Sequence, residues 1–158
     1  MMEVSLGERT AETAAVYFKR TRSPAIRKFL PQKARTLEEA LADFRKTREP
    51  GAESFGRTIR ADGQYVGDVW CYCMDRSGDP QAMVSYCVFE TALWGRGIAA
   101  RALGLFLAEL RERFGLERVG AFTFSENAAS IRVLEKNGFH REESFTEDGV
   151  ESGYYLRQ

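Results

Sequence analysis

The sequence predicts one α/β (α+β) domain, in which helices flank a mixed sheet. Helical patterns open the chain, three strand patterns follow in the middle, and strand and helix patterns alternate toward the end. The chain has 158 residues, which suits a single domain over residues 1–158. A domain of this length buries roughly 70% of the surface that its unfolded chain exposes, so one hydrophobic core is expected.

Two helices are expected in the first third of the chain. TAETAAVYFKR (10–20) repeats small and apolar residues at helical spacing, and so does TLEEALADFRKTRE (36–49). Thr36 and Glu39 fit a capping box, in which Thr36 accepts from the Glu39 N–H and Glu39 reaches back. SPAIRKFLPQ (23–32) contains two prolines, which predicts a short helical turn followed by a loop.

A meander of three strands is expected next, over residues 54–61, 64–75 and 82–90. Gly67 interrupts the second strand and indicates a bulge or the close approach of another backbone. The three cysteines of the chain, Cys71, Cys73 and Cys87, all lie in this apolar sequence, with Cys71 and Cys73 on one strand face. We expect them to be buried free thiols.

The last part predicts a helix from Ile98 to Phe114, a buried strand over 118–124, a second helix and a final hairpin. Asn127 is the expected N-cap of the second helix, and Gly138 follows it where a positive φ is needed. Asp148-Gly149 is a turn dipeptide between residues 140–147 and 150–158.

Composition excludes several classes of function. Lys plus Arg and Asp plus Glu both total 23, so no overall field attracts nucleic acid or an anionic membrane. No apolar run approaches the ~20 residues of a spanning helix, and the first residues do not resemble a signal peptide. We therefore expect a soluble, cytoplasmic protein. A metal site is not expected, because the single histidine has no partner ligands in the sequence.

LWGRGIAAR (93–101) leads from a strand into a helix through two glycines. Such a turn directs several backbone N–H groups at one point and forms an anion site at the helix N-terminus, to which Arg96 and Arg101 add charge. A plain tight turn fits the nine residues equally well. The spacing excludes a P-loop, whereas Gly95, Gly97 and Ala100 match the dinucleotide fingerprint without its acidic residue in the expected place.

A second motif distinguishes these alternatives. WGRGIAARAL, followed after one helix and one strand by ENAASIRVLEKNGF, resembles the GNAT superfamily of acetyl-CoA-dependent N-acetyltransferases, most closely its ribosomal-protein-alanine acetyltransferase branch. The resemblance covers nearly the whole chain. It implies a mostly antiparallel sheet that is splayed between its fourth and fifth strands.

The resemblance also implies a set of residues that bind acetyl-CoA. The pyrophosphate loop of the family, Gln/Arg-x-x-Gly-x-Gly/Ala, falls on residues 94–99, with Trp94 in place of the first side-chain donor. The strand before the loop would bind the pantetheine arm through its main chain, and Ser130 would lie near the thioester sulfur. The implied set is Cys87, Val88, Phe89, Trp94, Gly95, Arg96, Gly97, Ile98, Ala99, Ala100, Arg101, Asn127 and Ser130.

The implied activity is direct transfer of the acetyl group to a primary amine in a ternary complex. The expected oxyanion donor is an N–H near Val88 or Phe89. Leu134 and Phe122 occupy the positions of the tyrosine acid and glutamate base of many members, so Ser130 or a water is the expected proton donor. Glu90 is the first candidate base and Glu126 the second. Without a strong base, a weakly basic α-amino acceptor is favoured.

The acceptor stays open among protein N-termini, aminoglycoside-like antibiotics, polyamines and amino acids. Lys136 and Arg132 are candidates for contact with the 3′-phosphate of the coenzyme. The oligomeric expectation is a monomer or a homodimer. Two other functions remain at this point: a non-catalytic module that binds acyl-CoA, and a dinucleotide-dependent oxidoreductase.

Overall fold

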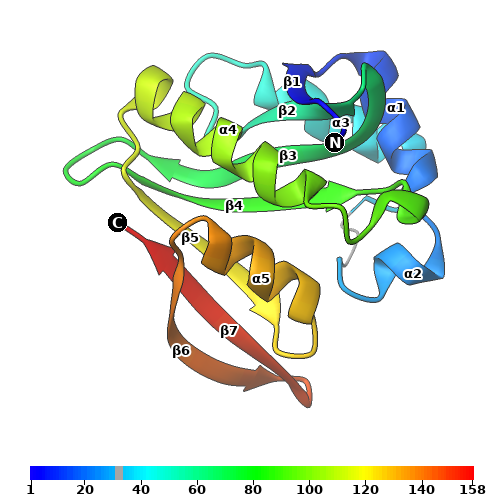
Figure 1. Cartoon of the computed structure of the whole chain (residues 1–158). Helices are drawn as coiled ribbons and strands as arrows, with labels where there is room; N and C mark the ends of the chain where they lie inside the picture. Colours follow the sequence, from blue (N-terminus) through cyan, green and yellow to red (C-terminus); the bar gives the residue numbers. More distant parts are fainter. Residues whose placement is uncertain (31–33) are drawn as a thin grey trace.

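The computed structural model describes residues 1–30 and 34–158, and its elements build a seven-stranded mixed sheet with helices on both faces (Figure 1). Residues 31 and 32, which were predicted to belong to the loop after the first short helical turn, lie outside the described residues. In chain order the elements are β1 (Val4–Glu8), α1 (Ala11–Arg20), α2 (Pro24–Arg27), α3 (Leu37–Thr47), β2 (Phe55–Ala61), β3 (Gln64–Asp75), β4 (Gln81–Val88), the 3-10 turn η1 (Thr91–Leu93), α4 (Ile98–Phe114), β5 (Arg118–Phe124), α5 (Ala128–Lys136), β6 (His140–Glu147) and β7 (Val150–Arg157).

The strand order is β1-β2-β3-β4-β5-β7-β6, and every neighbouring pair except β4 and β5 is antiparallel. The predicted meander is confirmed as β2, β3 and β4. Sequence reasoning missed β1, which pairs with β2 over five residues and makes β4 the fourth strand of the sheet. The mixed, mostly antiparallel fold class is therefore correct.

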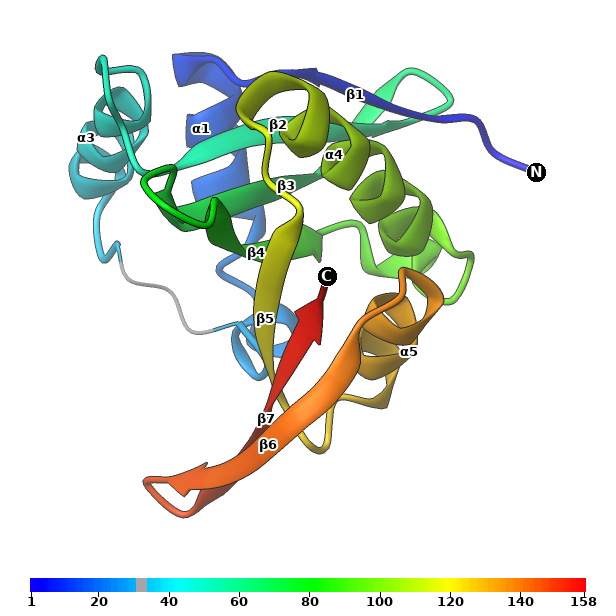
Figure 2. The ribbon, with the colours of Figure 1, turned by 90° about the vertical axis from the view of Figure 1, so that its left-hand side faces the viewer.

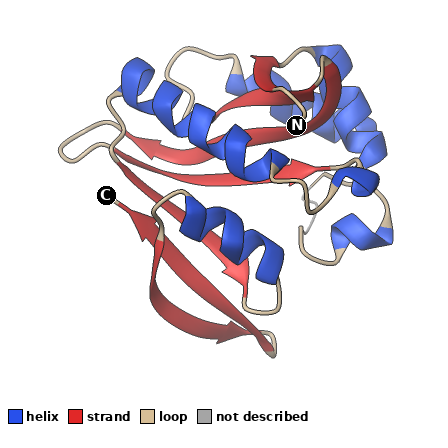
Figure 3. Cartoon of the chain, in the orientation of Figure 1, coloured by secondary structure: helices blue, strands red, loops and turns tan. Residues whose placement is uncertain are grey.

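The helices lie on opposite faces of the sheet, as Figures 2 and 3 show: α4 and α5 cover one face, and α1 and α3 the other. One side of α4 is buried against the sheet and includes Ile98, Ala102, Leu103, Phe106, Leu107 and Leu110. The predicted capping box is half correct: Thr36 accepts from the Glu39 N–H at 3.1 Å, but the Glu39 carboxylate accepts from the Arg35 N–H.

The parallel strands β4 and β5 separate soon after they meet. Their register covers three pairs, which end at Met83 and Gly120, although β4 continues to Val88 and β5 to Phe124. An unpaired strand edge exposes backbone donors and acceptors. The splay that the family resemblance implied is thus present between the fourth and fifth strands of the sheet.

The other edge of β4 lies very close to β3. A Cβ added to Gly67 would lie 2.1 Å from the Cys87 carbonyl oxygen, so the predicted close approach of another backbone is confirmed. The predicted bulge is present too, because the register of β2 and β3 shifts between the pairs Ile59–Gly67 and Arg60–Tyr65. Cys71 and Cys87 are buried free thiols as expected. Cys73 is exposed instead, because the register of β3 shifts between Tyr72 and Asp75 and Cys73 has a φ of 52°.

A buried carboxylate lies beside this edge of β4, which is called the closed edge because it pairs with β3. Asp68 is 1% exposed, forms an ion pair with Arg9 at 3.0 Å, and accepts from the Tyr65 hydroxyl at 2.6 Å. Burial raises the pKa of Asp68 to about 6, although Arg9 and Tyr65 act in the opposite direction. A buried ionisable group therefore lies on the side of the sheet that α1 covers.

The described residues include no helix long and apolar enough to cross a membrane. Among the same residues, no group of three potential ligands is placed to hold a metal ion.

Candidate functional site

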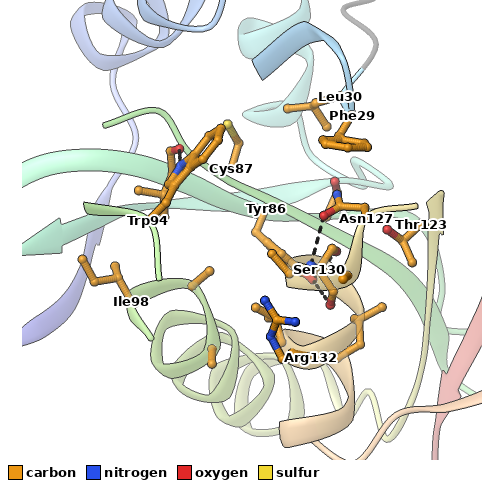
Figure 4. Close-up of a pocket in the computed structure, with 18 of the residues that line it drawn as sticks. Phe29, Leu30, Tyr86, Cys87, Trp94, Ile98, Thr123, Asn127, Ser130 and Arg132 are labelled. Carbon is orange, nitrogen blue, oxygen red and sulfur yellow. Dashed lines mark hydrogen bonds between the residues drawn. The ribbon is translucent and has the colours of Figure 1, made fainter. Parts of the chain in front are cut away.

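A cavity of about 660 Å³ lies in the splay between β4 and β5 and extends to α2, α4 and α5. Figure 4 shows Tyr86 on β4 opposite Asn127 and Ser130, with Phe29 and Leu30 at one end and Ile98 and Arg132 at the other. The predicted residues in its lining are Cys87, Val88, Trp94, Gly95, Gly97, Ile98, Ala99, Ala100, Asn127 and Ser130. Phe89, Glu90, Arg96 and Arg101 are outside the lining.

The glycine turn begins α4 at one wall of the cavity. Gly95 and Gly97 have φ values of 84° and 75°, which favour glycine, and a Cβ on either would meet nothing within 4 Å. The first bond of the helix joins the Arg101 N–H to the Gly97 carbonyl, so the N–H groups of residues 98–100 precede it without helical partners. Together with the helix dipole, these groups form an anion site open to the cavity.

The Arg101 side chain is hydrogen-bonded to the backbone next to this anion site. Its guanidinium donates to three backbone carbonyls: that of Gly97 at 3.3 Å, that of Arg96 at 3.2 Å, and that of Met2. The role of Arg101 in binding the coenzyme stays a prediction, and in the structure these guanidinium donors are directed at backbone carbonyls. Arg101 therefore connects the loop to the N-terminal segment through the Arg96, Gly97 and Met2 carbonyls.

The open edge of β4 presents different residues from those expected. The Phe89 N–H donates to the Val66 carbonyl at 2.9 Å, so Phe89 faces β3 and is not available as an oxyanion donor. Because such facing alternates along an antiparallel strand, Cys87 also faces β3, whereas the backbones of Tyr86 and Val88 face the cavity. The backbones of Val88 and Tyr86 are therefore available for main-chain contacts with a ligand in the cavity. The backbones of Cys87 and Phe89, which were expected from the sequence to make such contacts, are directed at β3 instead.

Trp94, which replaces the side-chain donor of the family motif, has a role of its own. Its indole Nε1–H donates to the Val88 carbonyl at 2.7 Å, and the side chain is half exposed. This bond occupies one acceptor of the open edge and fixes the η1 turn against the end of β4. The Val88 N–H on the same edge is not used by this contact.

Ser130 is held from two directions. Its backbone N–H donates to the Asn127 side chain at 3.1 Å, which confirms Asn127 as the N-cap of α5. Its hydroxyl lies 2.8 Å from the hydroxyl of Tyr86, which also donates to the Ser130 carbonyl at 3.2 Å. Burial raises the pKa of Tyr86, so the phenol keeps its proton. The Tyr86–Ser130 pair therefore joins β4 to α5 across the cavity.

The structure separates the two candidate bases. The Glu90 carboxylate accepts from Arg20 at 2.6 Å, and Arg20 also lies over the Phe89 ring, 4.9 Å from its centroid. Glu90 is thus paired on the α1 side and does not line the cavity, so this geometry does not favour it as the base. Glu126 does line the cavity and is exposed.

Cys87 places a thiol in the cavity lining, which raises the question of a covalent acyl-enzyme. Burial raises the pKa of this thiol to about 12, and the side chain is 9% exposed. Since the thiolate is the nucleophilic form of cysteine, this environment keeps Cys87 unreactive. Covalent catalysis by Cys87 is not supported.

Sequence reasoning named none of the residues that form one wall of the cavity. Ala25, Ile26, Phe29 and Leu30, from α2 and the residues after it, line the end opposite α4. Ile26 is 4% exposed and packs with Cys87 and Phe89, and Leu30 packs against the same cluster.

The comparisons with known proteins agree with this geometry. Residues 6–140 match the family model described as "Acetyltransferase (GNAT) domain", and the chain belongs to this family. It is 32% identical over 88 residues to the probable N-acetyltransferase YjcK of Bacillus subtilis (strain 168). That match spans 56% of this chain and about half, 48%, of the length of YjcK.

Solved structures share the fold at low identity. The aminoglycoside acetyltransferase AAC(6')-Ib in complex with coenzyme A superposes with a TM-score of 0.82 at 15% identity, over 99% of this chain and 95% of that one. The ribosomal L7/L12 α-N-protein acetyltransferase RimL gives a TM-score of 0.80 at 16% identity, over 99% and 94%.

Proposed function

We propose that the protein transfers an acetyl group from acetyl-CoA to a primary amine in a ternary complex. The observation that carries the proposal is the open edge of β4, which runs directly into the glycine turn and the N-terminus of α4. An extended arm with amide groups pairs with such an edge as a further strand would, and its phosphates then meet the anion site. Membership of the GNAT family supports the same donor.

The residues at this end of the cavity suit a phosphorylated ligand. Gly95 and Gly97 leave the space a phosphate needs, and the N–H groups of residues 98–100 supply donors. Arg132 and Lys136 lie one turn apart on α5 in the same lining, so both add positive charge. Acetyl-CoA, when bound, supplies an acetyl group activated as a thioester.

In the proposed reaction the amine nitrogen forms a bond to the acetyl carbon, the carbon–sulfur bond breaks, and the amine gives up a proton to water. The Val88 N–H faces the cavity and stabilises the negative charge on the acetyl oxygen. The Ser130 hydroxyl donates its proton to the leaving sulfur and takes up a proton from water, while the Tyr86 hydroxyl, 2.8 Å away, keeps its own proton and holds the Ser130 side chain in position. Positioning of both reactants supplies up to about 7–11 kcal/mol of the barrier.

The test combines ligand binding with turnover. Acetyl-CoA at about 100 times its Kd stabilises a folded protein by about 2.7 kcal/mol, a shift of several degrees in Tm for a domain of this size. We expect this shift with acetyl-CoA and CoA but not with NADH, together with release of free thiol when an amine is added. Absence of a shift with acetyl-CoA, in protein free of co-purified ligand, contradicts the proposal.

The two other functions predict different results in the same test. A module that binds acyl-CoA without catalysis gives the shift but releases no thiol with any amine. A dinucleotide-dependent oxidoreductase is disfavoured by the sheet, because its fingerprint requires a doubly wound parallel sheet and this one contains a single parallel pair.

A further inference from the structure

The two ends of the cavity differ in chemistry, and this difference bears on the unidentified acceptor. At the α4 end the lining includes the glycine turn and the first residues of α4, with their N–H groups, and the cations Arg132 and Lys136 of α5. At the α2 end they are the side chains of Ala25, Ile26, Phe29 and Leu30, which are all apolar. Figure 4 shows Phe29 and Leu30 beyond Asn127 and Ser130, on the side away from Arg132. The α2 end is therefore the place for the acceptor if the donor occupies the α4 end.

The charges around the cavity do not suit a polycation. Among the described residues in the lining, Glu126 is the sole carboxylate, whereas Arg132 and Lys136 are both cations. Glu90, two residues after β4, is paired with Arg20, and Asp68 is buried with Arg9. A polyamine or an aminoglycoside carries several ammonium groups, each of which loses hydration on entry without a carboxylate to replace it.

The α2 wall instead suits an apolar group on the acceptor. Phe29 is half-buried, and its ring is tilted against that of Phe124 with 6.5 Å between centroids. Leu30 packs toward the buried cluster of Ile26, Cys87 and Phe89. An aliphatic or aromatic group laid against these side chains removes apolar surface from water on both partners, while one amine reaches toward the Tyr86–Ser130 pair.

We propose that the acceptor is a primary amine of single positive charge whose amine-bearing carbon carries an apolar or aromatic group, and that Phe29 selects this group. The inference rests on the proposed acetyl transfer and names its acceptor class. Two sources share this chemistry: a free monoamine and the α-amine of an apolar amino-terminal residue. The chemical balance is unchanged, with one N–C bond formed, one C–S bond broken, and one proton passed to the sulfur.

The test measures thiol release from acetyl-CoA with a panel of amines of known chemistry. Phenylalanine amide and serine amide form a matched pair, because both present one α-amine and differ in the apolar ring. Phenylethylamine represents a free monoamine, and spermidine and an aminoglycoside represent polycations. We expect kcat/KM for phenylalanine amide or phenylethylamine to exceed those for serine amide and spermidine by at least about tenfold. The better of the two aromatic amines identifies the source.

Variants of Phe29 test the assignment of the wall. Phe29→Ala lowers kcat/KM for the aromatic acceptors by about tenfold and leaves KM for acetyl-CoA unchanged. Phe29→Glu adds a carboxylate and shifts the preference toward spermidine. Leu105→Glu is the matched control, because Leu105 is an exposed apolar residue of α4 outside the cavity lining, and this variant keeps the native preference.

The possible failures are distinguishable. A preference of the native chain for spermidine or the aminoglycoside overturns the inference, as does an unchanged acceptor profile in both Phe29 variants that keep the native Tm. No transfer to either aromatic amine, in protein that binds acetyl-CoA, also overturns it. Failure to bind acetyl-CoA contradicts the proposed function itself.

Discussion

The two edges of β4 have opposite properties. On one side the strand lies so close to β3 that the Cys87 carbonyl occupies the space of a side chain at Gly67, and a buried ion pair stands beside it. On the other side β4 pairs with β5 over three residues and then leaves the backbones of Tyr86 and Val88 facing a cavity. The closed edge holds the strand rigidly, so the open edge keeps its donors in place without a neighbouring strand.

The largest effect is expected from adding a side chain to Gly67 at the closed edge. Gly67→Ala places a Cβ 2.1 Å from the Cys87 oxygen and 2.9 Å from the Val88 Cα, so β3 and β4 must separate. We expect the free energy of unfolding to fall by more than about 3 kcal/mol, measured by chemical denaturation. In the control Gly104→Ala, the new Cβ meets the Asn137 side chain at 3.2 Å, and the change stays within about 1 kcal/mol. Equal free energies of unfolding for Gly67→Ala and Gly104→Ala would contradict the close approach of β4 to Gly67.

The buried carboxylate beside the closed edge predicts a pH-dependent stability. The pKa of Asp68 is raised from 3.8 to about 6, so the folded chain binds the proton more tightly than the unfolded chain. Stability from this group is present at pH 4 and is lost as the pH rises through 6, by about 3 kcal/mol in total. The stability of the native chain relative to Asp68→Asn should therefore fall between pH 4 and 7.

A control with the opposite sign is available for this measurement. Asp75 is fully exposed, and its hydrogen bonds from Ser77 lower its pKa, so Asp75→Asn removes stability that is present at high pH. Denaturation of the three proteins at several pH values distinguishes the two cases. A difference between native and Asp68→Asn that does not vary with pH would exclude a raised pKa at Asp68.

At the open edge, changes should affect turnover rather than stability. Ser130→Ala removes the proposed proton donor, and we expect kcat for acetyl transfer to fall about 100-fold with KM for acetyl-CoA little changed. Tyr86→Phe keeps the ring and removes the hydroxyl 2.8 Å from Ser130, so its loss is smaller. Ser144→Ala, at an exposed position of β6, is the control and should behave as the native chain. A native kcat in Ser130→Ala would show that a water, and not Ser130, protonates the leaving sulfur.

The smallest effect is expected where the open edge meets the glycine turn. Arg101→Met removes three hydrogen bonds to the carbonyls of Gly97, Arg96 and Met2, so the loop loses its orientation. We expect KM for acetyl-CoA to rise about tenfold while kcat changes little, in steady-state kinetics. Arg111→Met on the exposed side of α4 serves as the comparison. Equal KM values for these two variants would show that Arg101 does not position the loop.

The closed edge and the glycine turn were predictable from the sequence, because single residue types carry their signals. Gly67 stands in an otherwise strand-forming run, and the structure shows why no side chain fits there. Gly95 and Gly97 require positive φ, and Asn127 and Gly138 mark the two ends of α5 by local hydrogen bonding and backbone conformation. Such features depend on a few neighbours along the chain, so they can be predicted without knowledge of the tertiary fold.

Features that depend on register or on distant partners were not predictable. Whether Cys87 or Tyr86 faces the cavity depends on which residues of β4 pair with β3, and a shift of one residue reverses the answer. The bond from Arg101 to the Met2 carbonyl was not predictable, because Met2 lies 99 positions away. β1 and the α2 wall carry weak local patterns, and they become visible only when the sheet and the cavity are assembled.

The indole of Trp94 has a consequence for how the cavity can be observed. Trp94 is 49% exposed in the lining and anchored to Val88, whereas the other tryptophan, Trp70, packs in the cluster beneath α1. Any ligand that covers the glycine turn changes the solvent around one of the two indoles in the chain and leaves the other as it was. The intrinsic fluorescence of the native protein is thus a built-in reporter, and Trp94→Phe identifies which emission belongs to the cavity mouth.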